Sequence, residues 1–223
     1  MVGIAIARKK KCIVVLSGGP DSVTVAYWAK KRGYEVYALT FRYGQIADKE
    51  VKHATMISQS LGIPIKVIDL SSLKDVFVGV TSLCDRNIKM TSDFSQPIIV
   101  PFRNAIFLSA AVAYAISVGA IEILYGAQGS DEAFYPDCRT KFYKAFEKAA
   151  RLGTDTNISI KAPLSKLTKA EVIKLGAKLG VPFHLTWSCY LDMDKHCGKC
   201  ESCINRRKAF REAAIPDPTE YAE

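Results

Sequence analysis

One segment near the start of the chain constrains the fold more than any other. Residues 11–16, Lys-Cys-Ile-Val-Val-Leu, are apolar and rich in β-branched side chains, and they predict a buried strand. Ser-Gly-Gly-Pro-Asp-Ser follows at residues 17–22, and the pattern after it predicts a helix that ends near Gly33. A glycine loop between a strand and a helix presents backbone N–H groups and the positive end of the helix dipole, which favour a bound anion.

The alternation of strand and helix continues along the chain. We expect further strands over residues 36–41, 65–70, 122–126 and 158–162. We expect further helices over residues 48–61, 103–120, 143–152, 168–179 and about 201–213, the fourth opened by a Thr168/Glu171 capping box. Residues 71–100 show no period and predict an irregular segment. The order predicts parallel βαβ units and hence a doubly wound, mostly parallel α/β sheet.

Two apolar stretches raise the question of a membrane or a secretory signal. The longest uncharged run, residues 105–121, contains serines, a tyrosine, a glycine and many alanines, and is typical of a core helix. Residues 2–7 are apolar but precede a basic run, whereas a secretory signal has its charge first. We therefore expect a cytoplasmic protein without a membrane partner.

Four of the seven cysteines are clustered near the end of the chain, and the odd total disfavours a secreted disulfide framework. Their spacing, C-x7-C-x2-C-x2-C, predicts a closed tetrahedral shell of four thiolates around one structural zinc ion. An iron–sulfur cluster and a redox-active C-x-x-C pair are the alternatives. His196 would be a fifth ligand and is left out. The predicted ligands are Cys189, Cys197, Cys200 and Cys203.

The glycine loop is neither a P-loop nor a dinucleotide fingerprint, because no lysine follows its second glycine and the G-x-G-x-x-G spacing is absent. It resembles the pyrophosphate loop of the N-type ATP pyrophosphatases, an adenylating α/β family. The resemblance implies ATP as cosubstrate, with residues 1–185 as the ATP-binding domain and residues 186–223 as a zinc-binding segment packed on it. The residues expected at ATP are Leu16, Ser17, Gly18, Gly19, Pro20, Asp21, Ser22, Val23, Thr24, Arg103 and Lys169.

Two of these residues lie outside the loop. Arg103 begins an apolar helix, where a cation opposes the dipole unless an anion is nearby; a solvated surface arginine is the alternative. Lys169 completes a Pro-Leu-x-x-x-x-Lys element, residues 163–169, that resembles one found in other adenylating relatives. Asp21 either caps the helix or helps to hold magnesium.

Four further segments have a composition that packing does not require: residues 43–45 (Tyr-Gly-Gln), 100–104 (Val-Pro-Phe-Arg-Asn), 135–139 (Tyr-Pro-Asp-Cys-Arg) and 187–190 (Trp-Ser-Cys-Tyr). With the loop and the cysteines, they resemble the family of 7-cyano-7-deazaguanine synthases over nearly the whole chain. The resemblance implies ATP-dependent conversion of 7-carboxy-7-deazaguanine and ammonia to 7-cyano-7-deazaguanine, through adenylated acid and amide, for queuosine or archaeosine in tRNA. It also implies magnesium, a homodimer and no direct nucleic-acid partner. Residues 46–48, Ile-Ala-Asp, depart from the family's basic pair.

Candidate substrate residues follow the later strands. Asp131 lies after the strand ending near Gly126, where ligands bind in open α/β sheets, and offers a carboxylate to magnesium or substrate; a solvated loop is the alternative. Near Tyr135, Asp137 offers an acceptor to a purine's amino edge and Arg139 a guanidinium to a carboxylate. Cys138 is expected to pack or touch substrate rather than to act as a nucleophile, since no histidine lies near it in sequence. His53 and His184 are expected to be structural.

The formal charge of +9 suits a polyanionic partner, but nucleotides and RNA both qualify, as does an ordinary basic surface. Two other function classes therefore stay open. A tRNA-modifying enzyme of the same superfamily, such as a thiolase, usually needs an additional RNA-binding domain and a persulfide cysteine. The chain is too short for an obvious RNA-binding domain of this kind. A non-catalytic zinc module that binds nucleic acid has no need of the glycine loop.

Overall fold

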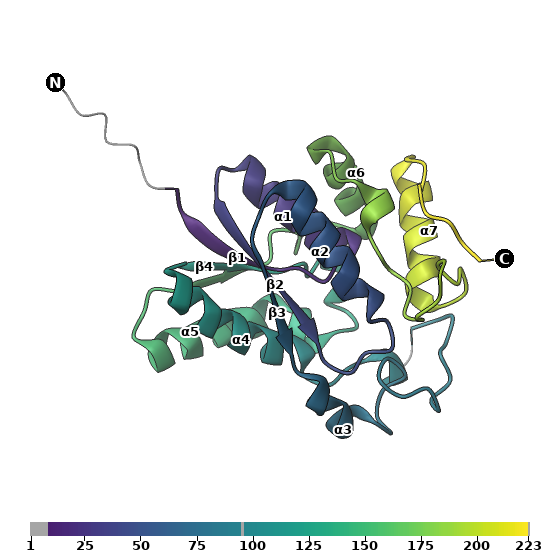
Figure 1. The fold of residues 1–223 in the computed structure, drawn as a ribbon, viewed down its shortest axis with the longest axis horizontal. Helices are drawn as coiled ribbons and strands as arrows, with labels where there is room; N and C mark the ends of the chain where they lie inside the picture. Colours follow the sequence, from purple (N-terminus) through teal and green to yellow (C-terminus); the bar gives the residue numbers. More distant parts are fainter. Residues whose placement is uncertain (1–8, 95, 223) are drawn as a thin grey trace.

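A parallel sheet forms the centre of the molecule. The structure is a computed structural model that describes residues 9–94 and 96–222, and its five strands run in the order β3-β2-β1-β4-β5 (Figure 1). The strands are β1 (Lys11–Val15), β2 (Glu35–Arg42), β3 (Ile65–Asp69), β4 (Glu122–Leu124) and β5 (Ser159–Lys161). The chain first builds outward from β1 and then crosses back to β4. This reversal creates a crevice at the carboxyl ends of β1 and β4, where doubly wound sheets bind ligands.

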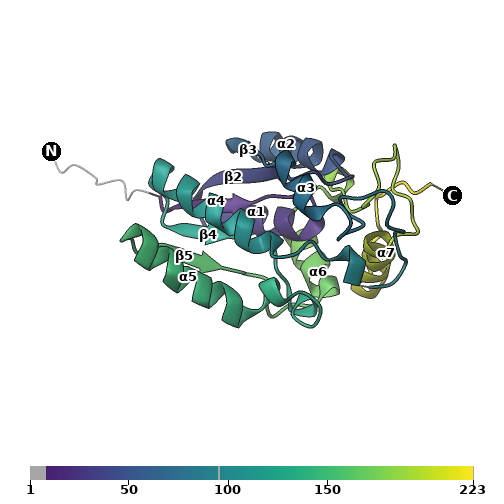
Figure 2. The same cartoon turned by 90° about the horizontal axis from the view of Figure 1, so that it is seen from below.

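Helices cover both faces of the sheet. They are α1 (Pro20–Lys31), α2 (Lys49–Leu61), α3 (Lys74–Phe77), α4 (Arg103–Val118), α5 (Thr140–Thr154), α6 (Lys169–Leu179) and α7 (Glu201–Ala213). Single 3-10 turns lie at Ser71–Leu73, Gln96–Ile98, Gly129–Asp131, Pro136–Cys138 and Phe183–Leu185. In Figure 1, α1, α2 and α6 lie above the sheet and α4 and α5 below it; Figure 2, seen from below, looks onto α4 and α5.

The side-chain alternation of β1 divides the core into two layers. Cys12 and Val14 are buried against α1, α2 and α6, whereas Ile13 is buried against α4 and α5. A strand buried on both faces has a continuous apolar sequence, which is why residues 12–16 are apolar throughout. The α/β fold and its parallel sheet confirm the prediction from sequence.

Most element boundaries agree with the expected ones to within two residues, and α5 shows the main difference. This helix begins at Thr140, three residues before the expected start, because Arg139 takes an extended conformation and serves as its N-cap residue. The first turn, Thr-Lys-Phe, is mostly polar and gives little apolar periodicity to detect. Residues 71–100 are largely irregular, as expected, with one turn of α-helix and two 3-10 turns.

The run at residues 105–121 lies mostly within α4, which buries Ala105, Leu108, Ala111, Val112 and Ala115 in the core. Across the described ranges, every helix is too short or too polar to span a bilayer. The expectation that the apolar stretch at residues 2–7 is not a secretory signal concerns residues outside those that the structure describes.

The C-terminal segment shares the core of the sheet. Ala209, Phe210 and Ala213 of α7 belong to the same buried cluster as α1 and α6, and the rings of Phe183 and Phe210 lie 5.0 Å apart, edge to face. In both views α7 lies beyond the carboxyl ends of the strands (Figures 1 and 2). This helix therefore forms a wall opposite the crevice.

Arg206 fixes that wall. Its side chain is 1% exposed, and its Nη1 donates to Thr186 Oγ1 at 2.8 Å while Nη2 donates to the Phe183 carbonyl at 3.1 Å. Nε donates to Asp217 Oδ1 at 3.1 Å, and Tyr221 donates its hydroxyl to the same carboxylate at 2.6 Å. A buried guanidinium with this many partners holds three separate segments in one arrangement.

Candidate active site and four-cysteine centre

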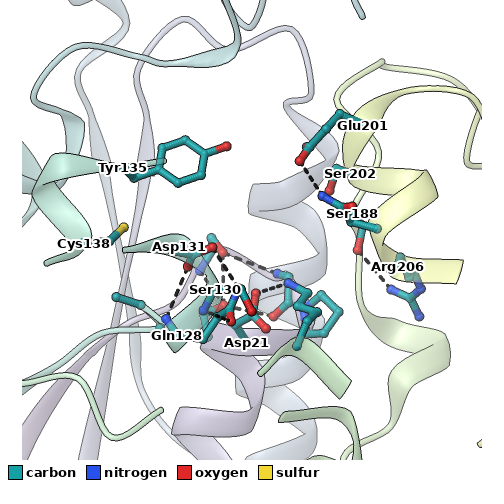
Figure 3. A pocket seen from close by; sticks show the side chains of 18 of the residues that line it. Asp21, Gln128, Ser130, Asp131, Tyr135, Cys138, Ser188, Glu201, Ser202 and Arg206 are labelled. Atoms are coloured by element: carbon teal, nitrogen blue, oxygen red, sulfur yellow. Dashed lines mark hydrogen bonds and ion pairs between the residues drawn. The ribbon is translucent and has the colours of Figure 1, made fainter. Parts of the chain in front are cut away.

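A cavity of about 810 Å³ lies between the carboxyl ends of the strands and α7. Its walls come from the glycine loop, from residues 125–135 after β4, from the start of α4 and from one side of α7 between Glu201 and Glu212. Figure 3 shows Glu201, Ser202 and Arg206 of α7 on the side opposite Asp21 and Asp131. The cavity therefore lies at the crevice that the sheet order creates. It also collects residues from both ends of the chain.

The glycine loop is held in one conformation by its own side chains and by the C-terminal segment. Gly18 has a φ of +84°, and a Cβ there would lie 2.6 Å from the Glu50 carbonyl oxygen, so glycine is required. Ser22 Oγ lies 3.1 Å from Ser17 Oγ and donates to the Gly19 carbonyl at 3.1 Å. Trp187 donates its backbone N–H to the Gly18 carbonyl at 2.9 Å.

The N-terminus of α1 lies at this loop. Gly19 is the N-cap residue and contributes no side-chain cap, and Pro20 occupies the first turn of the helix. The first backbone N–H groups of α1 therefore lack a side-chain acceptor at the edge of the cavity, which is the arrangement that binds phosphate.

The end of β4 packs closely against the loop. A Cβ at Gly126 would lie 2.9 Å from the backbone nitrogen of Ser22 and 3.1 Å from its Cα. Only glycine permits this approach of β4 to the loop. The position of the loop thus depends on a residue more than a hundred positions away.

Two carboxylates and one ammonium group lie together at the floor of the cavity. Lys169 Nζ pairs with Asp21 Oδ2, and Asp21 Oδ1 is buried with no hydrogen-bond partner in the described part of the chain. Asp131 accepts from Gln128 Nε2 at 2.8 Å. Burial and the neighbouring Asp21 raise the pKa of Asp131 to about 6, although Lys169 opposes this shift.

This donor set fits a hard divalent cation. Carboxylate oxygens are the ligands that Mg²⁺ prefers, and the orphaned Asp21 Oδ1 is a buried acceptor that a cation would satisfy. Asp21 and Asp131 both line the cavity, and the charge of Asp21 contributes to the raised pKa of Asp131. Asp21 and Asp131 are therefore the residues that would hold magnesium here.

Arg103 lines the cavity and contacts a tyrosine of the Tyr-Gly-Gln segment. Its Nη1 donates to Tyr43 Oη at 3.1 Å. Burial alone would lower the pKa of Arg103, but the nearby Tyr43 and Glu50 raise it above its ordinary value. Glu50 also lines the cavity, and burial raises its pKa to about 7, with Arg103 opposing. A permanent guanidinium at this wall suits an anionic ligand.

The segment at residues 46–48 lies outside the cavity lining. Gln45 turns inward on its own loop, accepting from the Tyr43 backbone N–H at 2.7 Å and donating to the Phe41 carbonyl at 3.1 Å. Asp48 pairs with Arg42 at 2.9 Å, with both side chains about half exposed. At this departure from the family's basic pair, Ala47 is buried and Asp48 is exposed, and neither residue lines the described cavity.

The segment at residues 135–139 is divided between the cavity and its support. Tyr135 and Cys138 line the cavity. Asp137 Oδ2 accepts from the Asn104 backbone N–H at 2.9 Å and so binds the start of α4, and Arg139 Nε donates to the Glu132 carbonyl at 2.9 Å. In the described chain, neither Asp137 nor Arg139 lines the cavity.

Cys138 is a buried thiol. Burial raises its pKa well above the ordinary value, and the carboxylates of Asp131 and Asp137 add to the shift. Asn104 Nδ2 lies 3.3 Å from its Sγ. Because a nucleophilic cysteine needs a lowered pKa, these surroundings agree with packing or ligand contact.

The histidines lie in structural surroundings. His53 Nδ1 lies 2.8 Å from the Leu185 carbonyl oxygen, and its ring packs on Trp187 with centroids 5.1 Å apart. His196 Nε2 accepts from the Ser188 backbone N–H at 3.0 Å, and among the described residues the sulfur cluster does not include His196. His184 is exposed.

The α7 wall was not anticipated from the sequence. Glu201 is 9% exposed and lines the cavity, and its Oε2 accepts from Tyr190 Oη at 3.1 Å. Asn205, one turn later on α7, donates to the other carboxylate oxygen. The sequence signal for Glu201 was its position between two predicted ligands, Cys200 and Cys203. The sequence did not show, however, that α7 faces the glycine loop.

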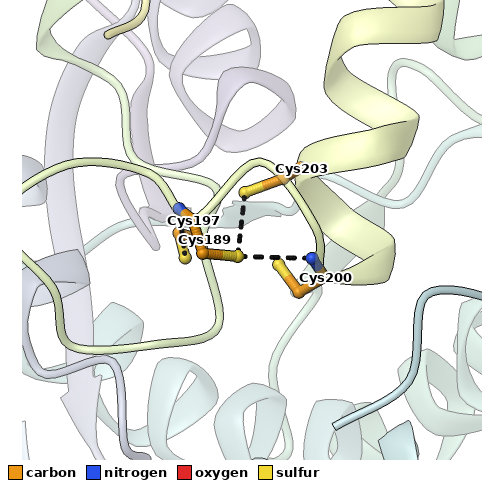
Figure 4. Close-up of side chains that lie close together, drawn as sticks. All are labelled: Cys189, Cys197, Cys200 and Cys203. Atoms are coloured by element: carbon orange, nitrogen blue, oxygen red, sulfur yellow. Dashed lines mark hydrogen bonds between the residues drawn. The ribbon is translucent and has the colours of Figure 1, made fainter. Parts of the chain in front are cut away.

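The four predicted cysteine ligands come together (Figure 4). Their sulfur atoms all lie within 4.8 Å of one another, all four side chains are buried, and none is in a disulfide. Backbone N–H groups point at the sulfurs, as from Cys200 to Cys197 Sγ at 3.2 Å. None of the four lines the described cavity.

This sulfur cluster fits a single metal ion. Bonds of about 2.3 Å in a tetrahedron require sulfurs roughly 3.8 Å apart, and Cys197 Sγ and Cys203 Sγ lie 3.9 Å apart. An iron–sulfur cluster would bind its thiolates through different irons and hold them farther apart. A closed shell of four thiolates would leave a metal ion no open position, which is typical of structural metal sites.

Sequence comparisons identify related proteins over nearly the whole chain. Residues 11–214 match the family described as "Queuosine biosynthesis protein QueC". A 7-cyano-7-deazaguanine synthase of Thermoplasma acidophilum is 42% identical over 221 residues, covering 96% of this chain and 93% of that protein. One of Oceanobacillus iheyensis is 41% identical over 219 residues, covering 95% of this chain and 98% of that protein.

Solved structures share the fold at low sequence identity. NMN synthetase from Francisella tularensis has a TM-score of 0.56 and 21% identity, covering 94% of this chain and 79% of that chain. A 4-thiouridine synthetase in complex with RNA and ATP has a TM-score of 0.53 and 18% identity, covering 92% of this chain and 50% of that chain. At this identity the similarity concerns the fold alone.

Proposed function

The chain belongs to the family of queuosine biosynthesis protein QueC, and we propose that it converts 7-carboxy-7-deazaguanine, ammonia and ATP to 7-cyano-7-deazaguanine. The observation that carries the proposal is the cavity, in which the glycine loop, two carboxylates and a wall of aromatic side chains face one space. The product is a precursor of the 7-deazaguanine nucleosides queuosine and archaeosine in tRNA.

ATP occupies the part of the cavity beside the loop. Of the proposed ATP-binding residues 16–24, residues 16, 17 and 19–22 line the cavity and would hold the phosphates through backbone N–H groups and the hydroxyls of Ser17 and Ser22, at the positive end of α1. Residues 18, 23 and 24 lie outside the described lining, and the Val23 N–H donates to the Gly19 carbonyl at 3.1 Å. Arg103 and Lys169 offset the phosphate charge. Asp21 and Asp131 would hold Mg²⁺, which would supply positive charge to offset that of the phosphates.

The first half of the reaction makes the amide. A carboxylate oxygen of the substrate attacks the α-phosphorus of ATP, the bond to the β-phosphate oxygen breaks, and pyrophosphate leaves into the glycine loop. Ammonia then attacks the carboxyl carbon, AMP leaves with the former carboxylate oxygen, and the nitrogen loses a proton. Because AMP is a far better leaving group than oxide, the adenylation overcomes the resistance of a carboxylate to amidation.

The second half makes the nitrile. The amide oxygen attacks the α-phosphorus of a second ATP, pyrophosphate leaves again, and loss of AMP and the remaining amide protons forms the carbon–nitrogen triple bond. Both halves need the same loop and the same substrate position. The side chains therefore act mainly by orientation and charge neutralisation, and no covalent enzyme intermediate is required.

The four-cysteine centre binds one zinc ion with a structural role, in this proposal. Zinc would join the loop at Cys189 to the start of α7 at Cys203, and so fix residues 186–223 as a segment packed on the ATP-binding domain of residues 1–185. The protein acts in the cytoplasm as a homodimer on free small molecules, without a direct nucleic-acid partner. Light scattering of the purified protein tests the dimer.

Contact of Tyr135 and Asp131 with the substrate is supported by their position in the cavity. Contact by Asp137 and Arg139 stays a prediction, since their observed partners are the start of α4 and the Glu132 carbonyl. Unchanged substrate affinity in the variants Asp137→Ala and Arg139→Ala would remove both from the substrate site.

The test is direct turnover. The purified protein is incubated with 7-carboxy-7-deazaguanine, ammonium, ATP and Mg²⁺, and the amide, the nitrile and the nucleotide product are followed by mass spectrometry. We expect nitrile together with AMP. Appearance of ADP instead would contradict the adenylation route, and absence of substrate-dependent ATP cleavage in zinc-loaded protein would favour an RNA substrate.

A matched pair of double variants makes the test specific to the loop. Ser17→Ala with Asp21→Ala removes a loop hydroxyl and a floor carboxylate, and turnover should be lost. Ser117→Ala with Asp192→Ala makes the same chemical changes at exposed positions away from the cavity, and turnover should be retained. Full turnover in the first double variant would contradict the assigned role of the loop.

A further inference from the structure

We propose that the first two turns of α7 recognise the guanine-like edge of the substrate. Glu201 accepts from the N1–H and the 2-amino group of the deazaguanine ring, Asn205 donates to its 6-oxo group, and aromatic side chains beside them hold the ring flat. This inference rests on the proposed function, because it assigns the base subsite of the same cavity.

Glu201 has unused acceptor capacity at the cavity wall. The carboxylate is buried, yet the partners of its two oxygens are a neutral phenol, Tyr190, and a neutral amide, Asn205. Each carboxylate oxygen can accept two hydrogen bonds, so two further donors can be taken up from the cavity. Burial of a carboxylate costs free energy unless its hydrogen-bonding capacity is filled. A ligand that donates to Glu201 would fill it, which makes this position a candidate for ligand contact.

The donor pattern of a guanine-type ring matches this wall. Its N1–H and 2-amino group are adjacent donors, and a carboxylate accepts both in a bidentate, charge-assisted pair. Its neighbouring 6-oxo group is an acceptor and suits the amide N–H groups of Asn205. Glu201 and Asn205 are four residues apart on one helix and therefore lie on the same face.

The α7 wall disfavours binding of adenine, the other purine-like ring present in the reaction. The adenine of ATP has an unprotonated N1, no 2-amino group and an amino group at position 6, so it offers Glu201 an acceptor where a donor is needed. An unmatched buried carboxylate lowers affinity for such a ring. The α7 wall can thus keep the two purine-like rings in separate places.

An aromatic cluster supplies surfaces for a flat bicyclic ring. The ring centroids of Phe94 and Phe134 lie 4.4 Å apart, and those of Phe94 and Tyr135 lie 5.6 Å apart, edge to face. All three side chains line the cavity, and Phe134 is 48% exposed. Partly exposed rings grouped at a cavity are typical of stacking surfaces for bases.

The geometry directs the reacting carboxylate toward the loop. In the deazaguanine ring the substituent at position 7 lies on the five-membered ring, whereas N1 and the 2-amino group lie on the far side of the six-membered ring. Glu201 and the floor carboxylates Asp21 and Asp131 face one another across the cavity (Figure 3). A base docked on α7 would therefore place its carboxylate on the side of the glycine loop.

The experiment compares two substrates in three proteins. One substrate is 7-carboxy-7-deazaguanine, and the other is 7-carboxy-7-deazahypoxanthine, which lacks only the 2-amino group. The proteins are wild type, Glu201→Gln and the exposed-site control Glu35→Gln, each checked for zinc content. Steady-state kinetics give KM for the base and for ATP separately, and calorimetry gives the affinity of each base without turnover.

We expect wild type and the control to prefer the 2-amino substrate by roughly 100-fold in kcat/KM, because the analogue leaves a buried acceptor unpaired. Glu201→Gln should lose most of this preference, since glutamine presents only one oxygen and an opposing amino group. Its KM for the base should rise by roughly 30-fold or more, while its KM for ATP stays within about twofold of wild type.

Several results would overturn the inference. These are equal affinity of wild type for the two bases in calorimetry, retained preference in Glu201→Gln, or a rise in KM for ATP instead of the base. If wild type binds and distinguishes the bases but converts neither, the proposed reaction fails and the subsite stands. If Glu201→Gln loses zinc, the affinity of Asn205→Asp for the two bases tests the inference instead. Aspartate cannot donate to the 6-oxo group, so this variant should bind both bases more weakly, and by the same factor.

Discussion

The ammonium group of Lys169, in the first turn of α6, pairs with the carboxylate of Asp21, in the first turn of α1, across 148 positions of the chain. Both helices begin at the edge of the cavity, so the ion pair joins two halves of the cavity floor. A phosphate that enters the glycine loop would compete with Asp21 for Lys169. The pair therefore holds the lysine in place before ATP arrives.

Loss of the Lys169 charge should reduce catalysis more than stability. Lys169→Met keeps the chain length but removes the cation that would face the phosphates, and we expect kcat/KM for ATP to fall by roughly 100- to 1000-fold. Lys166→Met, at an exposed position of the preceding loop, is the matched control and should stay within about twofold of wild type. Equal kinetics of the two variants would exclude Lys169 from the ATP site.

A methyl group at Gly126 should displace the glycine loop. In Gly126→Ala the added Cβ meets the backbone of Ser22 at 2.9 Å, and backbone atoms cannot move aside cheaply. We expect a higher KM for ATP and a loss of about 1–3 kcal/mol in the free energy of unfolding. Gly153→Ala, where a Cβ meets nothing within 4 Å in α5, should instead stabilise the protein by about 0.5 kcal/mol. Unchanged ATP affinity in Gly126→Ala would contradict the argument.

The free energy of unfolding should depend on Asp131 at mildly acidic pH. Its pKa is raised from 3.8 to about 6 in the folded protein, so the folded state binds the proton more tightly than the unfolded state. The resulting stabilisation is fully present below pH 3.8 and is lost as the pH rises through about 6. Urea titrations from pH 4 to pH 7 without magnesium should therefore show a steeper loss in wild type than in Asp131→Asn. Parallel pH profiles would refute the shift.

Removal of one thiolate should release the metal and loosen the C-terminal segment. We expect Cys200→Ala to lose stoichiometric zinc and to unfold at a lower temperature, because three ligands no longer close the shell. Cys84→Ala removes an equally buried thiol outside the cluster and should keep its zinc. Inductively coupled plasma mass spectrometry measures the zinc content of the two variants, and thermal unfolding measures their stability. Full metal content in Cys200→Ala would place the ion elsewhere.

The parts of the molecule that were predicted from the sequence are those fixed by local patterns. Residues 11–22 predict a strand, a loop and a helix because the apolar run, the glycines and the proline each act on their own neighbours. The four cysteines predict one cluster because their spacing limits where they can lie. The capping box at Thr168 predicts the start of α6 for the same reason.

The parts that were not predicted depend on packing between distant segments. Glu201 faces the glycine loop only because α7 packs on α6 and closes the cavity. Arg139 carries suitable chemistry for a carboxylate, but the turn at residues 136–138 directs its side chain to the Glu132 carbonyl. Composition shows which groups are present, whereas the direction of each side chain follows from the tertiary structure.

The contacts of Arg206 have a consequence for the order in which the protein matures on the ribosome. The sheet and its helices precede α7, and they can form while the chain is still being synthesised. Arg206, however, receives its carboxylate partner only when Asp217 has emerged, and Tyr221 reaches that carboxylate later still. A nascent chain can therefore contain a complete glycine loop while the α7 wall of the cavity is still unformed. Competence for the proposed reaction is therefore acquired only after this segment has been synthesised.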